Sequence, residues 1–222
     1  RLIAPNSENS DFGSQALEFG VTHQRRLGDG VFSADALAGR SFFGGEISAD
    51  YLRGTLGYGF AINERTRANF SGEVQRTDLQ GRFPRSNLRQ TLTTGLSYAT
   101  EAGNRVSGQI SFEAQGSENL NERYETLTAQ VSYGWREPIG PLQLSVAAGV
   151  ATSHFRDYTI ILPVPDGRRD TRVFGSVTAV FPTVDYAGFV PVVTLGVQDT
   201  RSNVSRFERN EYSLNVGIRS SF

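Results

Sequence analysis

The chain has 222 residues, 38% of them hydrophobic, and a net charge of −1, which allows one or two soluble domains or a single β-barrel of moderate size. Its mean hydropathy of −0.33 excludes a bundle of transmembrane helices. A membrane barrel stays possible, because its strands need an apolar residue only at every second position. Cysteine is absent, which excludes disulfides and cysteine-ligated zinc, and the near-neutral charge gives no electrostatic signature of nucleic-acid binding.

Apolar and polar residues alternate in runs along the whole chain, and this period of two predicts β-strands. In the last run, Tyr212, Leu214 and Val216 lie on one side of the ladder, and polar or small residues lie on the other. No segment keeps a helical apolar period, so no long helix is expected. The eleven expected strands cover residues 16–27, 31–39, 52–60, 68–74, 92–98, 106–114, 127–135, 142–150, 173–181, 193–197 and 211–222.

The opposite face of these strands is polar, so both faces of the expected sheet are specified. A tilted strand of about ten residues crosses the hydrocarbon of a bilayer. We therefore predict an all-β, antiparallel transmembrane β-barrel whose polar face lines the lumen. The charged residues expected to face the lumen are Glu18, Arg53, Glu73, Glu113, Arg136, Arg172 and Arg219.

The connections between the expected strands alternate in length, which is typical of outer-membrane barrels with short periplasmic turns and long extracellular loops. If the last strand descends to the periplasm, aromatic residues such as Tyr58, Tyr98, Tyr133 and Trp135 gather near the periplasmic rim, where amphipathic rings are favoured. The expected long loops are 40–50, 77–89, 116–123, 156–170 and 199–210; the expected turns are 28–30, 63–64, 101–104, 138–140 and a somewhat longer one at 183–190.

Eleven strands, the first of them descending, put residues 1–14 on the extracellular side. Single-chain bacterial barrels have an even number of strands, so at least one rising strand is expected before Arg1. Residues 1–222 are therefore interpreted as the carboxyl-terminal outer-membrane barrel domain of a longer protein, part of a barrel of about 12 to 14 strands. The alternatives are that one weakly patterned strand is wrong, or that residues 1–9 contain a short irregular strand.

Candidate catalytic residues are few, and the chain is not expected to be an enzyme. His154 and Asp157 lie near the start of a long loop, but Ser153, the adjacent candidate nucleophile, points to the opposite face of the same strand. His154 is therefore interpreted as a rim residue. No G-x-S-x-G motif, phosphate-binding loop or metal-ligand spacing is present, so neither a cofactor nor a metal is expected.

The end of the chain carries a more specific pattern. Arg168-Arg169-Asp170 opens one strand, Gly188-Phe189-Val190-Pro191 precedes the next, and Ser202-Asn203-Val204, Phe207-Glu208-Arg209 and the terminal Phe222 follow. This succession resembles the carboxyl-terminal barrel of the surface lipoprotein assembly modifier family, although Phe207 stands where the family usually has tyrosine. The motif residues are Gly188, Pro191, Ser202, Asn203, Arg209 and Phe222.

These motif residues need no catalytic role. Gly188 permits an unusual φ, and Pro191 suits the start of a strand because it cannot donate to a ladder. Ser202 and Asn203 suit a loop, in which their side chains bond to nearby backbone. The motif is therefore interpreted as structural.

The resemblance implies a barrel of about 14 strands preceded by a periplasmic helical-repeat domain, which is missing here. It also implies a role in moving lipoproteins, or in some members soluble haem-binding proteins, to the bacterial surface. The implied partners are a surface lipoprotein or secreted client, outer-membrane lipid, and the barrel insertion machinery, whose recognition signal Phe222 resembles. From the charged lumen residues alone, the alternative function is a passive porin or solute channel.

Overall fold

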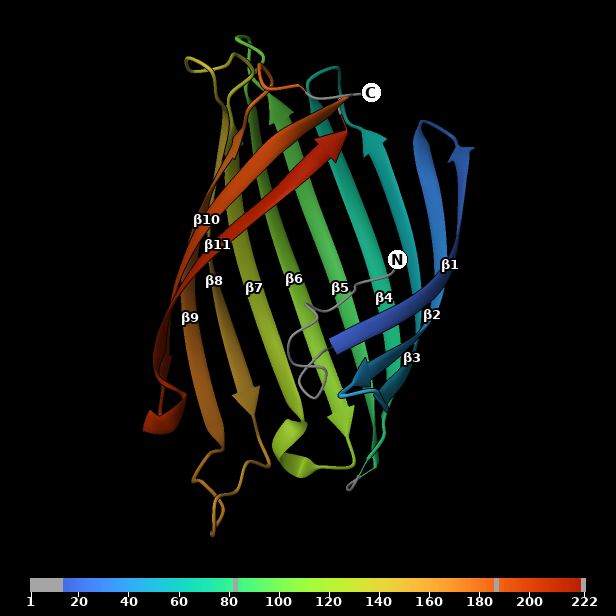
Figure 1. Cartoon of the computed structure of the whole chain (residues 1–222), viewed down its shortest axis with the longest axis vertical. Helices are drawn as coiled ribbons and strands as arrows, with labels where there is room; N and C mark the ends of the chain where they lie inside the picture. Colours follow the sequence, from blue (N-terminus) through green and yellow to red (C-terminus); the bar gives the residue numbers. More distant parts are fainter. Residues whose placement is uncertain (1–13, 82–83, 186–187, 221–222) are drawn as a thin grey trace.

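The structure, a computed structural model, describes residues 14–81, 84–185 and 188–220. They form one 11-stranded antiparallel sheet in which every strand lies beside its neighbours in sequence (Figure 1), which confirms the predicted fold class. The strands are β1 (Ser14–Leu27), β2 (Gly30–Phe43), β3 (Glu46–Ala61), β4 (Thr66–Leu79), β5 (Arg85–Ala99), β6 (Arg105–Ser117), β7 (Tyr124–Gly134), β8 (Gln143–Phe155), β9 (Arg168–Val180), β10 (Phe189–Ser202) and β11 (Arg209–Ser220). Two short 3₁₀ segments, η2 (Leu120–Glu122) and η3 (Ser205–Phe207), lie in connections. Within the described residues, no helix is long and apolar enough to cross a membrane.

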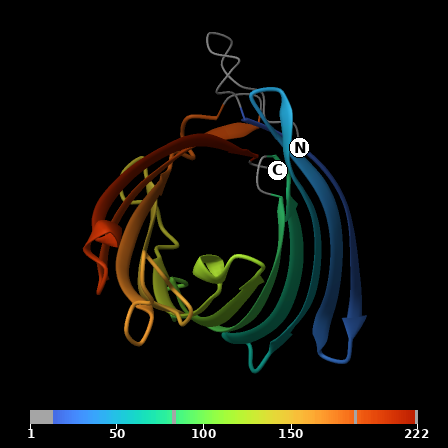
Figure 2. The same cartoon turned by 90° about the horizontal axis from the view of Figure 1, so that it is seen from below.

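The sheet curls around a central space (Figure 2), but its described residues do not close into a ring of hydrogen-bonded strands. Among them, β1 pairs only with β2, and β11 pairs only with β10. Among the described residues, β11 (209–220) therefore has one edge without a paired strand. Phe222 and the irregular strand considered for residues 1–9 lie outside the described residues.

The register keeps the same two side-chain faces from β1 to β11. Directly paired residues project to the same side of a sheet, so the pairs Glu73↔Thr91 and Thr91↔Glu113 carry one face from β4 to β6. Among the described pairs the register shifts only between Ser41 and Phe42, at the end of β2. A slip of one residue elsewhere would move charged side chains onto the apolar face, which explains why the register is held so strictly.

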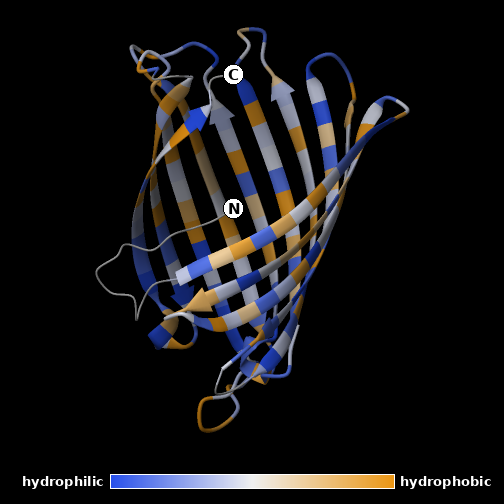
Figure 3. Ribbon diagram, turned by 45° about the vertical axis from the view of Figure 1, so that its right-hand side comes forward, coloured by the Kyte–Doolittle hydropathy of each residue, from blue (hydrophilic) through white to orange (hydrophobic). Residues whose placement is uncertain are grey.

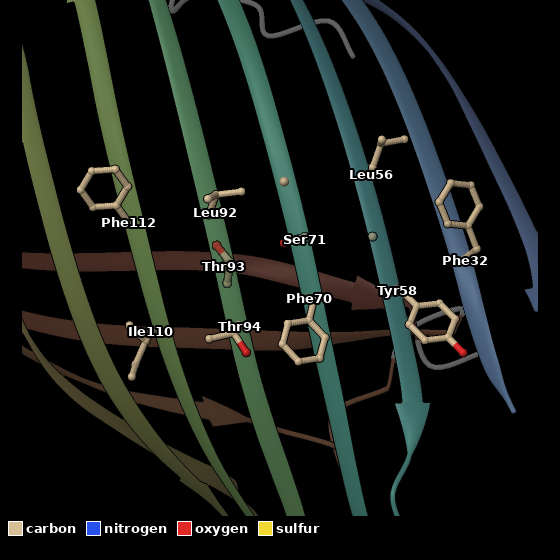
Figure 4. A pocket seen from close by; sticks show the side chains of 12 residues that line it. Phe32, Leu56, Tyr58, Phe70, Ser71, Leu92, Thr93, Thr94, Ile110 and Phe112 are labelled. Carbon is tan, nitrogen blue, oxygen red and sulfur yellow. The ribbon is translucent and has the colours of Figure 1, made fainter.

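The apolar face looks outward. Figure 4 shows Leu56, Phe70, Leu92 and Phe112 on the near side of their strands, with the opposite wall behind them. The hollow that these side chains line is part of the outer wall. Phe19 is 74% exposed, and no large side chain among the described residues is fully buried. Apolar area gains about 25 cal/mol per Å² on leaving water, so this wall is stable in lipid rather than in water.

The two ends of the sheet carry different connections. We name the end with connections 28–29, 62–65, 100–104, 135–142 and 181–188 the turn end, which is uppermost in Figure 1. The opposite end, the loop end, carries connections 44–45, 80–84, 118–123, 156–167 and 203–208. Figure 3 shows polar and apolar residues alternating along the strands between the two ends.

The predicted sorting of connections by length is wrong in part. Residues 40–50 form a hairpin rather than a long loop, because Gly44 and Gly45 take the positive φ angles of 59° and 82° that a two-residue turn requires. The side chains of Arg40 and Asp50 then pair across it at 2.6 Å. Other strands also extend into the expected loops, so connection 135–142 at the turn end is longer than 80–84 at the loop end.

Aromatic residues gather on the outer face at the turn end, as predicted. The Phe60 ring lies 5.7 Å from that of Tyr58 and 6.3 Å from that of Phe70. Trp135 follows the last residue of β7 instead of belonging to the strand, and its ring meets Tyr133 edge-on at 4.7 Å. The amphipathic rings therefore mark one boundary of the apolar wall.

Candidate functional site: the interior wall and the loop lock

The polar face of the sheet forms the interior wall. The register places on it six of the seven charged residues predicted to face the lumen: Glu18, Arg53, Glu73, Glu113, Arg172 and Arg219. The seventh, Arg136, lies outside the strands, in the connection 135–142 of the turn end. There its backbone N–H donates to Asn104 Oδ1 at 3.0 Å.

A ladder of charged groups crosses the interior wall from β3 to β6, and Tyr124 of β7 extends it by a hydrogen bond. Arg53 Nε lies 3.9 Å from a carboxylate oxygen of Glu73, which also accepts a hydrogen bond from Arg89 at 3.4 Å. Arg89 Nε lies 3.9 Å from Glu113, and the Tyr124 hydroxyl donates to Glu113 at 2.6 Å. The positive and negative charges of this ladder therefore hold one another across neighbouring strands.

Arg89 and Tyr124 were missing from the predicted lumen residues. The sequence pattern assigned Arg89 to a long loop, but β5 begins at Arg85 and brings Arg89 onto the wall. Strand β7 begins at Tyr124, three residues before the first clear apolar position at Leu127. Extending the period of two backwards from the apolar residues is the signal that could have found both.

The interior wall continues toward its two edges with other polar contacts. The Tyr51 hydroxyl donates to Glu18 at 2.6 Å, which links β3 to β1. Near the β11 edge, Gln198 donates to Glu211 at 2.5 Å. The Arg172 guanidinium lies 5.6 Å from the centre of the Phe174 ring, and Arg172 Nε is buried without a hydrogen-bond partner in the described part of the chain.

At the loop end, Arg168 is enclosed by aromatic rings. Its guanidinium carbon lies 3.5 Å from the centre of the Phe155 ring and 3.8 Å from that of Phe207. Arg168 Nε lies 3.2 Å from an Asp170 oxygen, an ion pair without hydrogen-bond geometry, and the residue is only 8% exposed. Cation–π contacts strengthen when they are desolvated, so this cluster joins β8, β9 and η3 firmly.

Ser202 and Asn203 complete the same cluster. Asn203 Oδ1 accepts from the Arg169 backbone N–H at 2.8 Å, and its Nδ2 donates to the Gly167 carbonyl at 2.9 Å. The Ser202 hydroxyl donates to Asp170 at 2.7 Å and also accepts locally from the Val204 N–H at 3.1 Å. The residues that hold connection 203–208 against β9, namely Phe155, Arg168, Asp170, Ser202, Asn203 and Phe207, are named the loop lock.

The hydrogen bonds of the loop lock agree with the expected local bonding of Ser202 but not with that of Asn203. Ser202 bonds to nearby backbone as expected, but Asn203 binds backbone groups 34 and 36 residues away. Phe155 was not singled out from the sequence, because nothing local distinguishes it from other strand aromatics. The order of the motifs Arg168-Arg169-Asp170, Ser202-Asn203 and Phe207 was the only signal that these segments act together.

The remaining motif residues lie apart from the loop lock. Gly188, with φ +79°, closes the connection 181–188 by donating to Asp185 Oδ1 at 2.9 Å. Pro191 lies near the start of β10, where its carbonyl accepts from Phe181 at 3.0 Å. Arg209 begins β11 and pairs with Glu211 at 3.3 Å.

A second loop-end cluster surrounds Glu122 in η2, which leans over the central space in Figure 2. Arg85 Nη2 lies 2.7 Å from the Glu122 carboxylate. Burial favours a higher pKa for Glu122, but the hydrogen bond and charge of Arg85, with hydrogen bonds from Asn87 and Ser117, outweigh it and lower the pKa. The neighbouring Asn121 accepts from the Thr159 N–H at 2.7 Å, so η2 is also tied to connection 156–167.

The residues weighed for catalysis are not brought together. Ser153 lies on the interior face, where its hydroxyl lies 2.7 Å from that of Thr126. His154 lies on the outer face with Nε2 3.0 Å from the Asp166 carbonyl oxygen. Among the described residues, no group of three or more His, Cys, Asp or Glu side chains could hold a metal ion.

Comparison with known proteins gives a family and a fold. The family model described as "Surface lipoprotein assembly modifier" matches residues 8–222. No curated protein matches the chain. The β domain of the Bordetella autotransporter Brka has a similar fold, with a TM-score of 0.53 and 13% identity over 94% of this chain and 90% of that one. LpxR from Salmonella typhimurium gives a TM-score of 0.39 and 11% identity, over 92% and 88% of the two chains.

Proposed function

Because the chain belongs to the surface lipoprotein assembly modifier family, we propose that it assists the translocation of lipoproteins, or of related secreted proteins, to the bacterial cell surface. The protein is a barrel of the bacterial outer membrane with a role in surface lipoprotein assembly. Its turn end, with the aromatic residues and the carboxyl-terminal end of β11, faces the periplasm, and its loop end faces outward.

The interior ladder is the observation that carries this proposal. Its arginines Arg53 and Arg89 are paired with Glu73 and Glu113, so the wall offers many hydrogen-bonding groups without a strong field of one sign. An extended polypeptide can exchange hydrogen bonds with such a surface without being trapped by unpaired charge. The apolar outer wall meanwhile keeps the barrel in the membrane.

The proposal needs no covalent chemistry. We assign the protein neither an enzymatic activity nor a cofactor, metal or nucleic-acid partner. Its partners are the client lipoprotein or secreted protein, outer-membrane lipid and the machinery that inserts barrels into the outer membrane. The isolated position of His154 on the outer face agrees with a rim residue.

Protease shaving of intact cells tests the function. Deleting the gene should remove surface exposure of at least one lipoprotein, and expression of the complete protein should restore it. A variant with Glu73→Gln and Glu113→Gln should restore it poorly, because two interior arginines lose their partners. A matched control with Asp50→Asn and Asp199→Asn, which removes two acidic groups from the outer face, should restore it fully. Unchanged exposure of every lipoprotein after deletion would contradict the proposal.

The charged interior also favours a second candidate, a passive solute channel. Planar-bilayer recordings of the complete protein separate the two functions. Steady, ion-selective openings that change with Glu73→Gln would favour the channel. A silent barrel, together with loss of lipoprotein exposure in the deletion strain, would favour export.

A further inference from the structure

At the turn end, the interior wall carries a cluster of arginines. Arg105, Arg136 and Arg219 line one recess of about 380 Å³, together with Trp135 and Gln143. Arg105 begins β6, Arg136 follows β7, and Arg219 lies near the end of β11. Three separate parts of the fold thus bring arginines to one recess.

These three arginines differ from Arg53 and Arg89 of the ladder, which have acidic partners. None of them forms an ion pair within residues 14–81, 84–185 and 188–220, and no acidic side chain lines the recess. The neighbouring Glu101 is already bound by Arg65 at 3.0 Å. Glu137, next in sequence to Arg136, is exposed and does not line the recess.

The position of Arg136 depends on a glycine. A Cβ atom on Gly103 would lie 2.3 Å from Arg136 Cδ, and Gly103 has a φ of +78° that L-residues rarely adopt. The turn 100–104 therefore provides space in which the Arg136 side chain lies across the backbone. The Arg136 side chain, although exposed, thus lies against a turn that itself lines the recess.

Unpaired guanidinium groups in a concave site attract anions strongly. The low-dielectric walls focus their field, and each guanidinium can form paired hydrogen bonds to a carboxylate. Register places Arg105 and Arg219 on the polar interior face, away from the apolar outer wall that contacts lipid. The site is therefore suited to a carboxylate-bearing polypeptide rather than to a lipid headgroup, and Gln143 on the interior face adds a hydrogen-bonding group beside it.

We propose that this recess binds acidic side chains of an extended client segment as the client reaches the barrel from the periplasm. The inference rests on the proposed function, because it takes a polypeptide as the molecule that enters the turn end. It also sets the order in which a client contacts the two parts of the interior wall. Acidic segments of the client bind first at the arginines of the recess. They then reach the ladder, whose arginines are paired with glutamates and therefore attract acidic groups less strongly.

Peptide binding to the complete protein in detergent tests the proposal. The probe is a fluorescent ten-residue peptide rich in glutamate, measured by anisotropy at low and high salt. The variant Arg105→Gln/Arg136→Gln/Arg219→Gln should bind it about tenfold more weakly than the unmodified protein, with a smaller salt dependence. A matched control, Arg40→Gln/Arg76→Gln/Arg201→Gln, removes equal charge from the outer face at the loop end and should bind within about twofold of the unmodified protein. The single substitution Gly103→Ala should weaken binding by displacing the Arg136 side chain.

Several other outcomes would contradict the proposal, and the Gly103→Ala variant covers the case in which the triple variant does not fold. Equal binding by the triple variant, or an equal loss in the control, overturns it. If free glutamate or inorganic phosphate binds as tightly as the peptide, the recess is a small-anion site and the polypeptide assignment is wrong. If a heat-modifiable gel shift shows that the triple variant is unfolded, the Gly103→Ala result decides. Loss of peptide binding with unchanged lipoprotein exposure contradicts the role in client entry and leaves the proposed function intact.

Discussion

Arg168 at the loop end and Arg105 at the turn end occupy equivalent places in the fold, since each is the first residue of its strand and each lies on the interior face. Arg168 is buried among aromatic rings and paired with Asp170, whereas Arg105 is exposed and unpaired in the described part of the chain. The same residue type therefore fixes loops at one end and stays available for binding at the other. The difference lies in the neighbours that the fold supplies.

The largest expected effect follows from removing Arg168. The substitution Arg168→Leu leaves the Asp170 carboxylate without its cation and should lower the free energy of unfolding by about 3 kcal/mol, because breaking a buried ion pair leaves a charge uncompensated. Urea unfolding in lipid vesicles, followed by the fluorescence of the single tryptophan, Trp135, measures it. As a control, Arg76→Leu removes an exposed ion pair and should cost less than about 1 kcal/mol. Equal costs for the two variants would contradict the special role of the loop lock.

The next effect concerns Asn203. The substitution Asn203→Ala removes two long-range hydrogen bonds of the loop lock and should cost about 2 kcal/mol in the same unfolding measurement. Hydrogen exchange should also rise in connection 203–208. The control is Asn215→Ala on the interior face of β11, in a strand that is exposed along its length. A smaller loss for Asn203→Ala than for Asn215→Ala would show that the lock does not hold the loop.

A smaller, pH-dependent effect is expected at Glu122. Its folded pKa is lowered, so its contribution to stability is complete above the unfolded value of about 4.3 and is lost as the pH falls through the folded pKa. The protection of connection 118–123 against hydrogen exchange, taken relative to the intrinsic rate at each pH, should therefore fall upon acidification below that unfolded value. In Glu122→Gln the protection should already be low at neutral pH and change less upon acidification. A wild-type loop whose protection does not respond to acid would refute this assignment.

The smallest effect is expected at the turn end. The substitution Arg105→Gln should change the free energy of unfolding by less than about 0.5 kcal/mol, because the exposed guanidinium has no ion-pair partner in the described residues to lose. The same urea titration measures it beside Arg168→Leu. A loss comparable to that of Arg168→Leu would erase the contrast between the two ends and make Arg105 a structural residue.

Part of the candidate site could be predicted from the sequence, because side-chain alternation is a local property. Glu73 and Glu113 lie on the polar face wherever their strands exist, so the period of two assigns their side. The ends of strands were less predictable. Arg89 was assigned to a loop, because short polar runs near strand ends give the same pattern whether they pair or not.

The sequence by itself determined the eleven strands of the described residues, the side that their residues face and the membrane setting, because all three follow from a period that any short window of the chain displays. Only the tertiary structure decided which charges have partners. Asn203 bonds to Gly167, Arg168 stacks between Phe155 and Phe207, and Arg105 and Arg219 line one recess, although these segments lie far apart in the chain. Such contacts depend on the curvature of the sheet and on where its connections fold, and no local pattern encodes either of these.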